Sequence, residues 1–419
     1  MKITTKKYRD TSWDFVQANT KTYTHCFHNY PAMMIPQVAE KLISEFGKNA
    51  SLLFDPYCGT GTSLVEANLK GINAIGTDLN PLARLVALAK TTVLNIQVLD
   101  LYLKEFADFI FSLIFGQNKP NIVIPSFKNI DYWFDKSIQQ KLATIKYFIE
   151  KIEDNKIKNF FLVAFSETVR DCSWTRNGEF KLYRMSEKQR QKFNPDVFSI
   201  MINKLSRNKK GLVEYIEAVK NKNIFTKIYD FNTVFEVKYI PKETVDLVIT
   251  SPPYGDSRTT VAYGQFSRLS NQWIGVDEAS QIDKKLMGGN TKKKIKKFGI
   301  NIVDDIIAEI SKLDEKRAKE VYSFYDDYYK SIKNVASLIK KNGFVCYVVG
   351  NRKVKGITLP TDEITKSFFE SNGFSHIETI IRSIPNKRMP KRNSPANQVG
   401  ITDNTMNYEY VVIMEKIKA

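Results

Sequence analysis

A strand, a glycine-containing turn and a helix, followed by a second strand that ends in an aspartate, constrain this chain more than any other feature. The apolar residues 51–54 predict a buried strand, and Pro56 ends it because proline cannot donate to the hydrogen-bonded ladder of a central strand. Residues 62–70 follow with a helical pattern, and residues 73–77 predict the next strand. This alternation is typical of a parallel α/β sheet that binds its ligand at the carboxyl ends of the strands.

The turn, which reads DPYCGTGT over residues 55–62, indicates a nucleoside ligand. Gly59 and Gly61 allow the backbone to pass close to a bound molecule. Asp78 lies nineteen residues after Gly59 at the end of the second predicted strand, where a carboxylate accepts hydrogen bonds from ribose hydroxyls. The turn lacks the third glycine of the dinucleotide fingerprint and the lysine of a phosphate-binding loop. A nucleoside without phosphates, such as S-adenosylmethionine, therefore fits better than a dinucleotide.

A second motif, TSPPY at residues 250–254, follows another predicted strand. Its two prolines supply no backbone donor, and they leave carbonyl oxygens as acceptors beside the hydroxyl of Ser251 and the ring of Tyr254. Such acceptors suit a planar base that carries an exocyclic amine. We expect Ser251 and the carbonyl of Pro252 to accept the two amine protons. We expect Tyr254 to stack on a base that has left the duplex.

The remaining strand patterns predict a sheet that is interrupted by a long insert. Buried strands are expected at residues 224–228, 245–250 and 344–349. The strands expected at residues 375–381 and 408–414 pair as an antiparallel hairpin near the end of the chain.

The insert is expected to be largely helical, because its clearest element, residues 135–154, places apolar side chains on one helical stripe. The fold class is therefore α/β, with a mostly parallel sheet, a C-terminal antiparallel hairpin and a helical insert domain. We expect three parts: the first half of the core at residues 1–94, the insert at residues 95–222 and the second half of the core at residues 223–419.

Positive charge is concentrated in three segments of a chain whose net charge is +18. Residues 181–222 hold eleven lysines and arginines against four acids. Residues 284–297 hold seven lysines, residues 382–392 hold five basic residues, and neither segment contains an acid. A polyanion, and nucleic acid first of all, is the partner that such segments favour.

The overall composition, with 43% hydrophobic and 26% charged residues, is that of a globular protein. The most apolar stretch, residues 106–115, is half as long as the roughly twenty residues of a membrane helix. The N-terminus has no apolar segment of the kind found in secretory signals. We therefore expect a cytoplasmic protein without a membrane partner.

The cysteines and histidines predict neither a disulfide framework nor a metal site. The four cysteines lie far apart and form no CxxC pair, so we expect reduced thiols. His25, Cys26 and His28 are close in sequence, but no further ligand group accompanies them.

DPYCGTGT and TSPPY, with TDLNP at residues 77–81 between them, resemble the motifs of the amino-group DNA methyltransferases, which act on cytosine N4 or adenine N6. The segment HCFHNYPA at residues 25–32 looks like the N-terminal cofactor motif of that family. The resemblance implies a Rossmann-like methyltransferase fold, S-adenosylmethionine as cofactor and double-stranded DNA as substrate, with a cognate restriction endonuclease as a further partner. The order of the motifs resembles the arrangement in which a recognition domain lies in mid-chain, which makes residues 95–222 the candidate.

Carried over by this resemblance, the catalytic residues are Ser251, Pro252, Pro253 and Tyr254. The residues expected to bind the cofactor are Tyr30, Pro31, Ala32, Asp55, Cys58, Gly59, Thr60, Gly61, Thr62, Asp78, Leu79, Asn80, Asp230 and Phe231. Asp230 and Phe231 are expected at the adenine edge, and Asp246, in the following strand, is the competing acid.

Basic residues near aromatic ones predict DNA contacts after the TSPPY motif. Residues 255–273 are interpreted as a mobile loop that leads into the lysines at 292–297, and residues 385–393 as a second phosphate clamp. The candidate DNA-binding residues are Arg258, Arg268, Lys292, Lys293, Lys294, Lys387, Arg388, Lys391 and Arg392.

We expect the target to be the N4 amine of a flipped cytosine, with the N6 amine of adenine as the alternative. Within the family, serine at the first position of the PPY motif is associated mainly with cytosine N4, and aspartate or asparagine mainly with adenine N6. Ser251 can accept a hydrogen bond from either amine. Cytosine C5 chemistry is disfavoured because it needs a thiolate, usually from a Pro-Cys pair, and no cysteine here follows a proline. An RNA base methyltransferase and an inactive DNA-binding protein are more distant alternatives.

Overall fold

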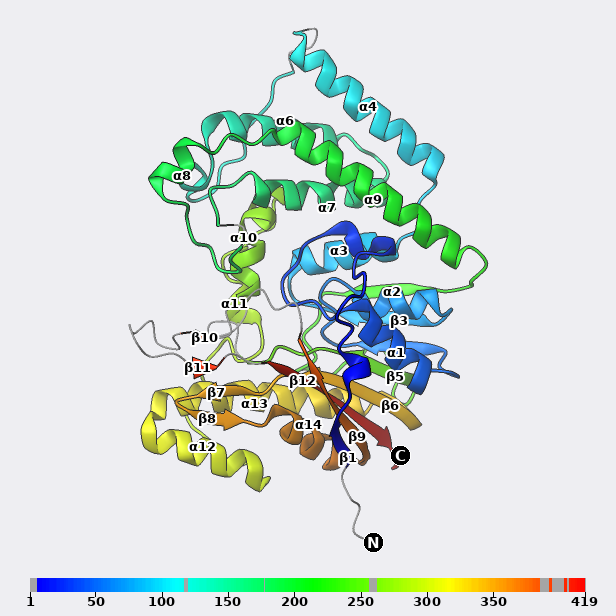
Figure 1. Ribbon diagram of the computed structural model, residues 1–419, viewed down its shortest axis with the longest axis vertical. Coiled ribbons are helices and arrows are strands. Elements are labelled where there is room, and N and C mark those ends of the chain that lie inside the picture. The colour runs from blue at the N-terminus through cyan, green and yellow to red at the C-terminus, as the bar shows by residue number, and fades with distance from the viewer. Residues whose placement is uncertain are drawn as a thin grey trace.

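The computed structural model describes residues 6–116, 120–176, 178–255, 262–384, 392–393, 403–404 and 407–418. Across these residues an eight-stranded sheet has the order β1-β9-β12-β6-β5-β2-β3-β4 (Figure 1). Its strands are β1 (Lys6–Arg9), β2 (Leu52–Asp55), β3 (Asn73–Thr77), β4 (Thr226–Tyr229), β5 (Val245–Thr250), β6 (Ile339–Val349), β9 (Phe374–Ser383) and β12 (Tyr408–Lys416).

The sheet is mostly parallel and becomes antiparallel at the C-terminal strand. The successive strands β6, β5, β2, β3 and β4 pair with one another in parallel. Strand β12 lies between β6 and β9 and is antiparallel to both. The expected α/β class and the C-terminal antiparallel pair are confirmed. Alternate residues of the strands face two separate cores, so that Leu53 packs on one side of the sheet and Phe54 on the other.

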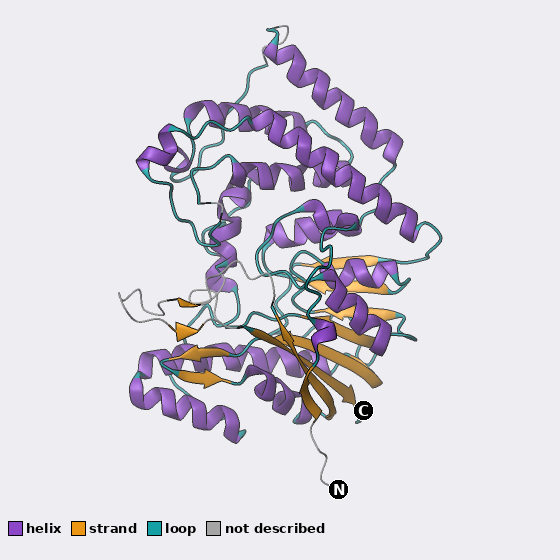
Figure 2. Cartoon of the chain, in the orientation of Figure 1, coloured by secondary structure: helices purple, strands orange, loops and turns teal. Residues whose placement is uncertain are grey.

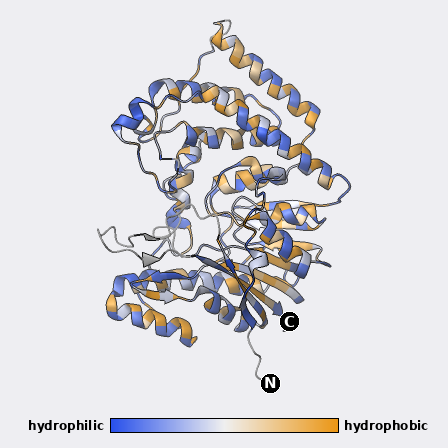
Figure 3. Cartoon of the chain, viewed as in Figure 1, coloured by the Kyte–Doolittle hydropathy of each residue, from blue (hydrophilic) through white to orange (hydrophobic). Residues whose placement is uncertain are grey.

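Helices cover both faces of this sheet, and the apolar residues of the central strands lie between them (Figure 3). One face packs against α1 (Pro36–Phe46) and α2 (Thr62–Leu69). The other packs against α12 (Asn301–Leu313), α13 (Glu315–Ala336) and α14 (Thr361–Glu370). The short elements are η1 (Thr11–Trp13), η2 (Tyr23–Phe27), and the two-stranded pairs β7 (Arg352–Val354) with β8 (Ile357–Leu359) and β10 (Arg392–Asn393) with β11 (Asp403–Asn404).

The insert forms a layer of helices beside the sheet (Figure 2). Its helices are α4 (Ile96–Ile114), α5 (Ile130–Trp133), α6 (Lys136–Glu150), α7 (Asn155–Asp171), α8 (Glu187–Gln191) and α9 (Val197–Val219). Their apolar side chains share one core with α3 (Pro81–Thr91) of the sheet domain. The expected helical character of the insert is therefore confirmed, and α3 connects it to the sheet.

One expectation about the segment after TSPPY is wrong. We expected residues 255–273 to form a mobile loop, but residues 263–274 form helix α10 (Tyr263–Ile274), which α11 (Ile282–Lys285) follows. Phe266, Leu269 and Trp273 recur at helical spacing and are buried in the core of the insert. The ring of Trp273 packs edge-on against aromatic rings of the insert. This tertiary packing holds α10 in place. Residues 256–261, which include Arg258, lie outside the described residues.

No helix among the described residues is long and apolar enough to cross a membrane. The four cysteines are buried and free of disulfides.

Candidate cofactor and target-base site

A pocket lies where the carboxyl ends of β2, β3 and β5 meet the N-terminal segment, by which we mean residues 25–34. Its empty volume is about 940 Å³, part of which is open to solvent. The lining comes from segments far apart in sequence: Tyr30, Pro31, Ala32, Met33 and Met34; Asp55, Pro56, Tyr57, Cys58, Gly59, Thr60, Thr62 and Ser63; Asp78, Leu79 and Asn80; Phe231, Asn232 and Thr233; Ser251 and Pro253; and Tyr263, Leu286 and Met287. The two sequence motifs therefore share one pocket.

Asp55 joins the two motifs at the floor of the pocket. Its Oδ1 accepts hydrogen bonds from the Thr250 hydroxyl at 2.5 Å and from the Tyr57 backbone N–H at 3.0 Å, and its Oδ2 accepts one from the Ser63 hydroxyl. Burial raises the pKa of Asp55 to about 6, although these hydrogen bonds oppose the shift. The carboxyl group thus fixes the end of β2 against the end of β5.

Asp78 holds the glycine turn open. Its Oδ2 accepts a hydrogen bond from the Gly59 backbone N–H at 3.1 Å, and its Oδ1 accepts one from the Asn80 backbone N–H at 2.7 Å. Gly59 has a φ of +49°, and no atom lies within 4 Å of the position where a Cβ would stand. A ligand can therefore approach the backbone at this point. Burial raises the pKa of Asp78.

Asn80 links the glycine motif to the N-terminal segment and to α10. Its side-chain amide donates to the Tyr30 hydroxyl at 2.8 Å and to Ser267 Oγ at 3.0 Å. The rings of Tyr30 and Tyr263 are stacked, with centroids 6.0 Å apart and planes 14° from parallel. Ala32 has a φ of +49°, a conformation that residues other than glycine rarely adopt. The N-terminal segment therefore forms one wall of the pocket.

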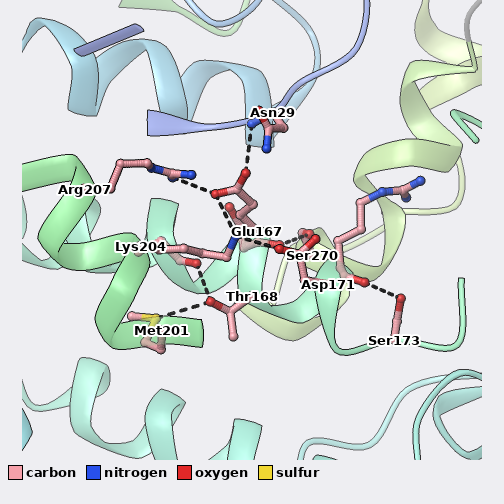
Figure 4. Close-up of polar contacts among 12 residues, drawn as sticks. Asn29, Glu167, Thr168, Asp171, Ser173, Met201, Lys204, Arg207 and Ser270 are labelled. Carbon is pink, nitrogen blue, oxygen red and sulfur yellow. Dashed lines mark hydrogen bonds and ion pairs between the residues drawn. The ribbon is translucent and has the colours of Figure 1, made fainter. Parts of the chain in front are cut away.

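The N-terminal segment is also anchored to the insert by buried charge (Figure 4). Glu167 of α7 accepts a hydrogen bond from the Asn29 backbone N–H at 3.2 Å and pairs with Lys204 at 3.1 Å and Arg207 at 2.7 Å, both of α9. Arg207 donates to the backbone carbonyl of Phe27 at 2.9 Å. The insert therefore supports the wall that Tyr30 forms.

The pocket fits S-adenosylmethionine on the chemistry of its lining. The carboxylates of Asp55 and Asp78 complement a ligand that carries a sulfonium and an ammonium group. The rings of Tyr57 and Phe231 supply surfaces for a nucleoside base, and the open backbone at Gly59 admits close contact.

The TSPPY motif reaches the pocket through two of its residues. Ser251 and Pro253 line the pocket, whereas Pro252 and Tyr254 do not. The Tyr254 hydroxyl donates a hydrogen bond to Glu409 Oε1 of β12 at 2.9 Å, and it lies 3.3 Å from Ser251 Oγ. The TSPPY motif is thus tied to the last strand of the sheet.

Comparisons with known proteins agree with this arrangement. The profile of an N6/N4 methyltransferase family, described as DNA methylase, matches residues 2–90. The type II methyltransferase M.MvaI of Kocuria varians is 39% identical to this chain in an alignment that covers 96% of this chain and 93% of that protein. The type II methyltransferase M.BsoBI of Geobacillus stearothermophilus is 21% identical, with coverage of 86% and 81%.

The chain belongs to the amino-group DNA methyltransferases. It is a homologue of the type II enzymes of restriction-modification systems, and S-adenosylmethionine is its cofactor. Among solved structures, the rRNA methyltransferase aviRa of Streptomyces viridochromogenes covers 93% of this chain and 88% of its own, with 10% identity and a TM-score of 0.32. At such a TM-score the assignment of the fold depends on the strand order of this methyltransferase itself.

The remaining expected cofactor residues differ in their placement. Phe231 lines the pocket, but Asp230 does not, because its carboxylate forms a bidentate pair with Arg84 at 2.8 and 3.0 Å. Gly61 does not line the pocket, and a Cβ added to it would meet Ala87 at 3.0 Å. Asp246 accepts from the backbone of Ser51 and Leu52 and so acts at the amino ends of the strands.

Several lining residues were missed from the sequence. Tyr57 and Ser63 lie within or beside the glycine motif, so their nearness to it could have indicated them. Leu286 and Met287 reach the pocket from the segment after α11, and no local pattern marks them. Glu409 does not line the pocket, but its contact with Tyr254 was also missed because it is far from both motifs in sequence.

The candidate DNA-binding residues have different surroundings. Lys292 pairs with Asp326 and with Asp327, the latter at 2.8 Å, whereas Lys293 and Lys294 are exposed. Arg268, on α10, is partly buried. Lys387, Arg388 and Lys391, together with the side chain of Arg392, lie outside the described residues.

Within the described residues, histidine, cysteine, aspartate and glutamate side chains nowhere gather in a group that could hold a metal ion. His25 Nε2 forms a hydrogen bond of 2.7 Å with Glu66 Oε1.

Proposed function

We propose that this methyltransferase transfers the methyl group of S-adenosylmethionine to the exocyclic N4 amine of a cytosine that has flipped out of duplex DNA. The observation that carries the proposal is Ser251, which stands first in the PPY motif and lines the cofactor pocket. Serine at this position resembles the cytosine-N4 enzymes of the family, whereas adenine-N6 enzymes mainly have aspartate or asparagine there.

The residues around the pocket have separate roles in this reaction. S-adenosylmethionine supplies the activated methyl group. Asp78 positions the cofactor-binding turn, and Asp55 holds that turn against the TSPPY strand. Ser251 Oγ and the Pro252 carbonyl accept the amine protons, so that the lone pair of the amine is directed at the methyl group. Tyr254 bounds the place of the flipped base.

We assign the insert at residues 95–222 to target recognition. It carries basic side chains that have no acidic partner within the described protein and that lie against aromatic rings. The guanidinium carbon of Arg184 lies 4.0 Å from the ring centroid of Tyr132 and 5.1 Å from that of Trp174. That of Arg190 lies 5.2 Å from the Trp174 centroid. Stacked guanidinium groups of this kind suit contacts with phosphates and base edges.

The charge of this part of the insert differs from that of its helical support. Residues 172–193 contain six basic residues and two acids. In the described part of the chain none of these six side chains forms a salt bridge, whereas Lys204 and Arg207 pair with Glu167. In the view of Figure 1, α8 lies on the same side of the molecule as β10 and β11. We propose that both elements face the DNA.

The recognition segment is attached to the helix that follows the catalytic motif. Arg170 donates to the carbonyl oxygens of Phe266 in α10 at 3.2 Å and of Glu179 at 2.6 Å. Leu182 N–H donates to Gln265 Oε1 at 3.3 Å. A duplex bound to this segment would therefore be placed in a defined position relative to Ser251. A cognate restriction endonuclease is proposed as the companion activity, on the names of the type II relatives.

Methyl transfer from radiolabelled S-adenosylmethionine tests the proposal. The purified protein is incubated with unmethylated duplex DNA and, in parallel, with structured RNA. Label is expected in the DNA and, after hydrolysis and chromatography, in N4-methylcytosine. Label in N6-methyladenine would replace the proposed base by adenine, and label confined to the RNA would overturn the proposal altogether.

A further inference from the structure

Glu409 connects the catalytic tyrosine to a buried arginine. It lies on β12 directly opposite Arg382 of β9, and the two side chains form an ion pair. The Arg382 side chain is only 4% exposed, and its Nε donates to the Trp13 backbone carbonyl at 2.8 Å. The other oxygen of Glu409 accepts the hydrogen bond from the Tyr254 hydroxyl. The carboxylate is therefore held in place on both sides.

The proton positions in this chain of contacts follow from counting donors. An ionised carboxylate can only accept hydrogen bonds, and a neutral phenol has a single proton to donate. Burial and the charge of Glu409 raise the pKa of Tyr254, so the phenol keeps its proton at neutral pH. The proton of Tyr254 is therefore committed to Glu409.

The direction of the second contact is then fixed as well. Because the phenolic proton points at Glu409, the Tyr254 oxygen offers only lone pairs to Ser251, which lies 3.3 Å away. The Ser251 hydroxyl must donate its proton to Tyr254. Its own lone pairs remain for the pocket, into which Ser251 is exposed. This contact is longer than the usual O–H···O distance, and catalytic hydrogen bonds commonly shorten when substrate binds.

We propose that Glu409 is a positioning residue that sets Ser251 as a hydrogen-bond acceptor toward the target base. A base that presents an amine to Ser251 is then accepted, whereas a base that presents a carbonyl oxygen meets lone pairs and is rejected. Sites built to bind a donor discriminate strongly against substrates that lack it. The inference depends on the proposed amino-group transfer and names a residue that controls it.

Glu409→Gln tests this inference because it should reverse the direction of the chain. The amide oxygen would turn to the Arg382 guanidinium, so the amide NH₂ would face Tyr254. Tyr254 would then donate to Ser251, and the Ser251 proton would point at the incoming amine. We expect single-turnover methyl transfer to slow by about tenfold or more, with affinities for cofactor and DNA within about twofold of wild type.

The matched control is Glu415→Gln, the same change on the same strand at a residue without a hydrogen bond to Tyr254. It should transfer methyl groups at the wild-type rate. If Glu409→Gln is as fast as this control while wild type forms the methylated amine, the inference is overturned and the proposed function stands. If wild type forms no methylated amine, the proposed function itself fails.

A double-mutant cycle separates this role from a general structural one. In Tyr254→Phe the ring remains but the hydroxyl that connects Glu409 to Ser251 is gone. Adding Glu409→Gln to this variant should change the transfer rate by less than about twofold, because the effect passes through that hydroxyl. A second loss as large as that in the wild-type background would contradict the inference.

Discussion

The hydroxyl of Thr250 donates a hydrogen bond of 2.5 Å to Asp55, and this contact joins two motifs that lie 195 positions apart in the chain. Thr250 ends the strand that carries TSPPY, and Asp55 ends the strand that carries the glycine turn. The parallel pairing of β2 with β5 brings them together. The glycine turn and the TSPPY motif are therefore parts of one hydrogen-bonded unit, with Ser251 next to the buried Thr250.

Asp78→Ala should weaken the binding of S-adenosylmethionine by about tenfold or more, because the carboxylate orders both Gly59 and Asn80 and faces the pocket. Isothermal titration calorimetry measures the effect. The matched control is Asp277→Ala, at an exposed aspartate outside the pocket, which should leave the affinity unchanged. Equal affinities in the two variants would contradict the role of Asp78.

Glu167→Gln should lower the stability of the protein by about 3 kcal/mol at neutral pH, because Lys204 and Arg207 would lose the buried charge they share. Burial alone would raise the pKa of Glu167, but the positive charges of protonated His28, Lys204 and Arg207 outweigh it and lower the pKa to about 2. The stabilisation is thus complete above the usual pKa of about 4.5 and is lost as the pH falls toward 2.

Urea unfolding of wild type and Glu167→Gln at several pH values tests whether the stabilisation by Glu167 decreases in acid. The difference in stability should be constant near neutrality and should narrow below about pH 4.5. Glu150→Gln, on the exposed end of another insert helix, should cost less than about 0.5 kcal/mol. A difference between wild type and Glu167→Gln that grows in acid would contradict the assignment.

The fold was predictable where a local pattern coincides with a packing requirement. Proline after Phe54-Asp55 and the apolar strands identified β2, β3 and β5 correctly, because central parallel strands are apolar along most of their length. Helix α10 was not predicted, because it is held by the aromatic core of the insert rather than by its own composition. The aromatic residues that pack against Trp273 are distant in sequence, so the helix could not be predicted from residues 263–274 alone.

The site was likewise predictable only in part, where its residues lie at the ends of parallel strands. Asp55, Asp78 and Ser251 lie at strand ends, so their convergence follows from a parallel sheet. Asp230 also ends a strand, but Arg84 draws its carboxylate away from the pocket. Glu409 gives no local signal, because only the antiparallel pairing of β12 brings it to Tyr254.

Exposed lysines should contribute to DNA affinity, and internally paired ones should not. Replacing Lys293 and Lys294 together by glutamine should reduce the slope of log affinity against log salt by about one per lysine. Lys292→Gln is the matched control, since Asp326 and Asp327 already compensate its charge. Fluorescence anisotropy with a labelled duplex measures both slopes. An equal loss of slope per lysine in the control would contradict the distinction.

Arg184→Ala should reduce the preference for the target duplex over a non-target duplex by about tenfold, since a specific arginine contact contributes about 1–3 kcal/mol. The comparison requires that the methylated site first be mapped by sequencing. Arg317→Ala, at an arginine that pairs with Glu320 on α13, should leave this preference unchanged. Unchanged preference in Arg184→Ala would argue against recognition by this cluster.

Mass spectrometry of nucleosides from DNA treated with the purified protein identifies the base that carries the transferred methyl group. Wild type with S-adenosylmethionine should produce N4-methyldeoxycytidine, and Ser251→Ala should lower its yield by about a hundredfold or more, because the acceptor of the amine proton is lost. N6-methyldeoxyadenosine as the sole product of the wild-type protein, or N4-methyldeoxycytidine formed equally well by Ser251→Ala, would contradict the proposed reaction.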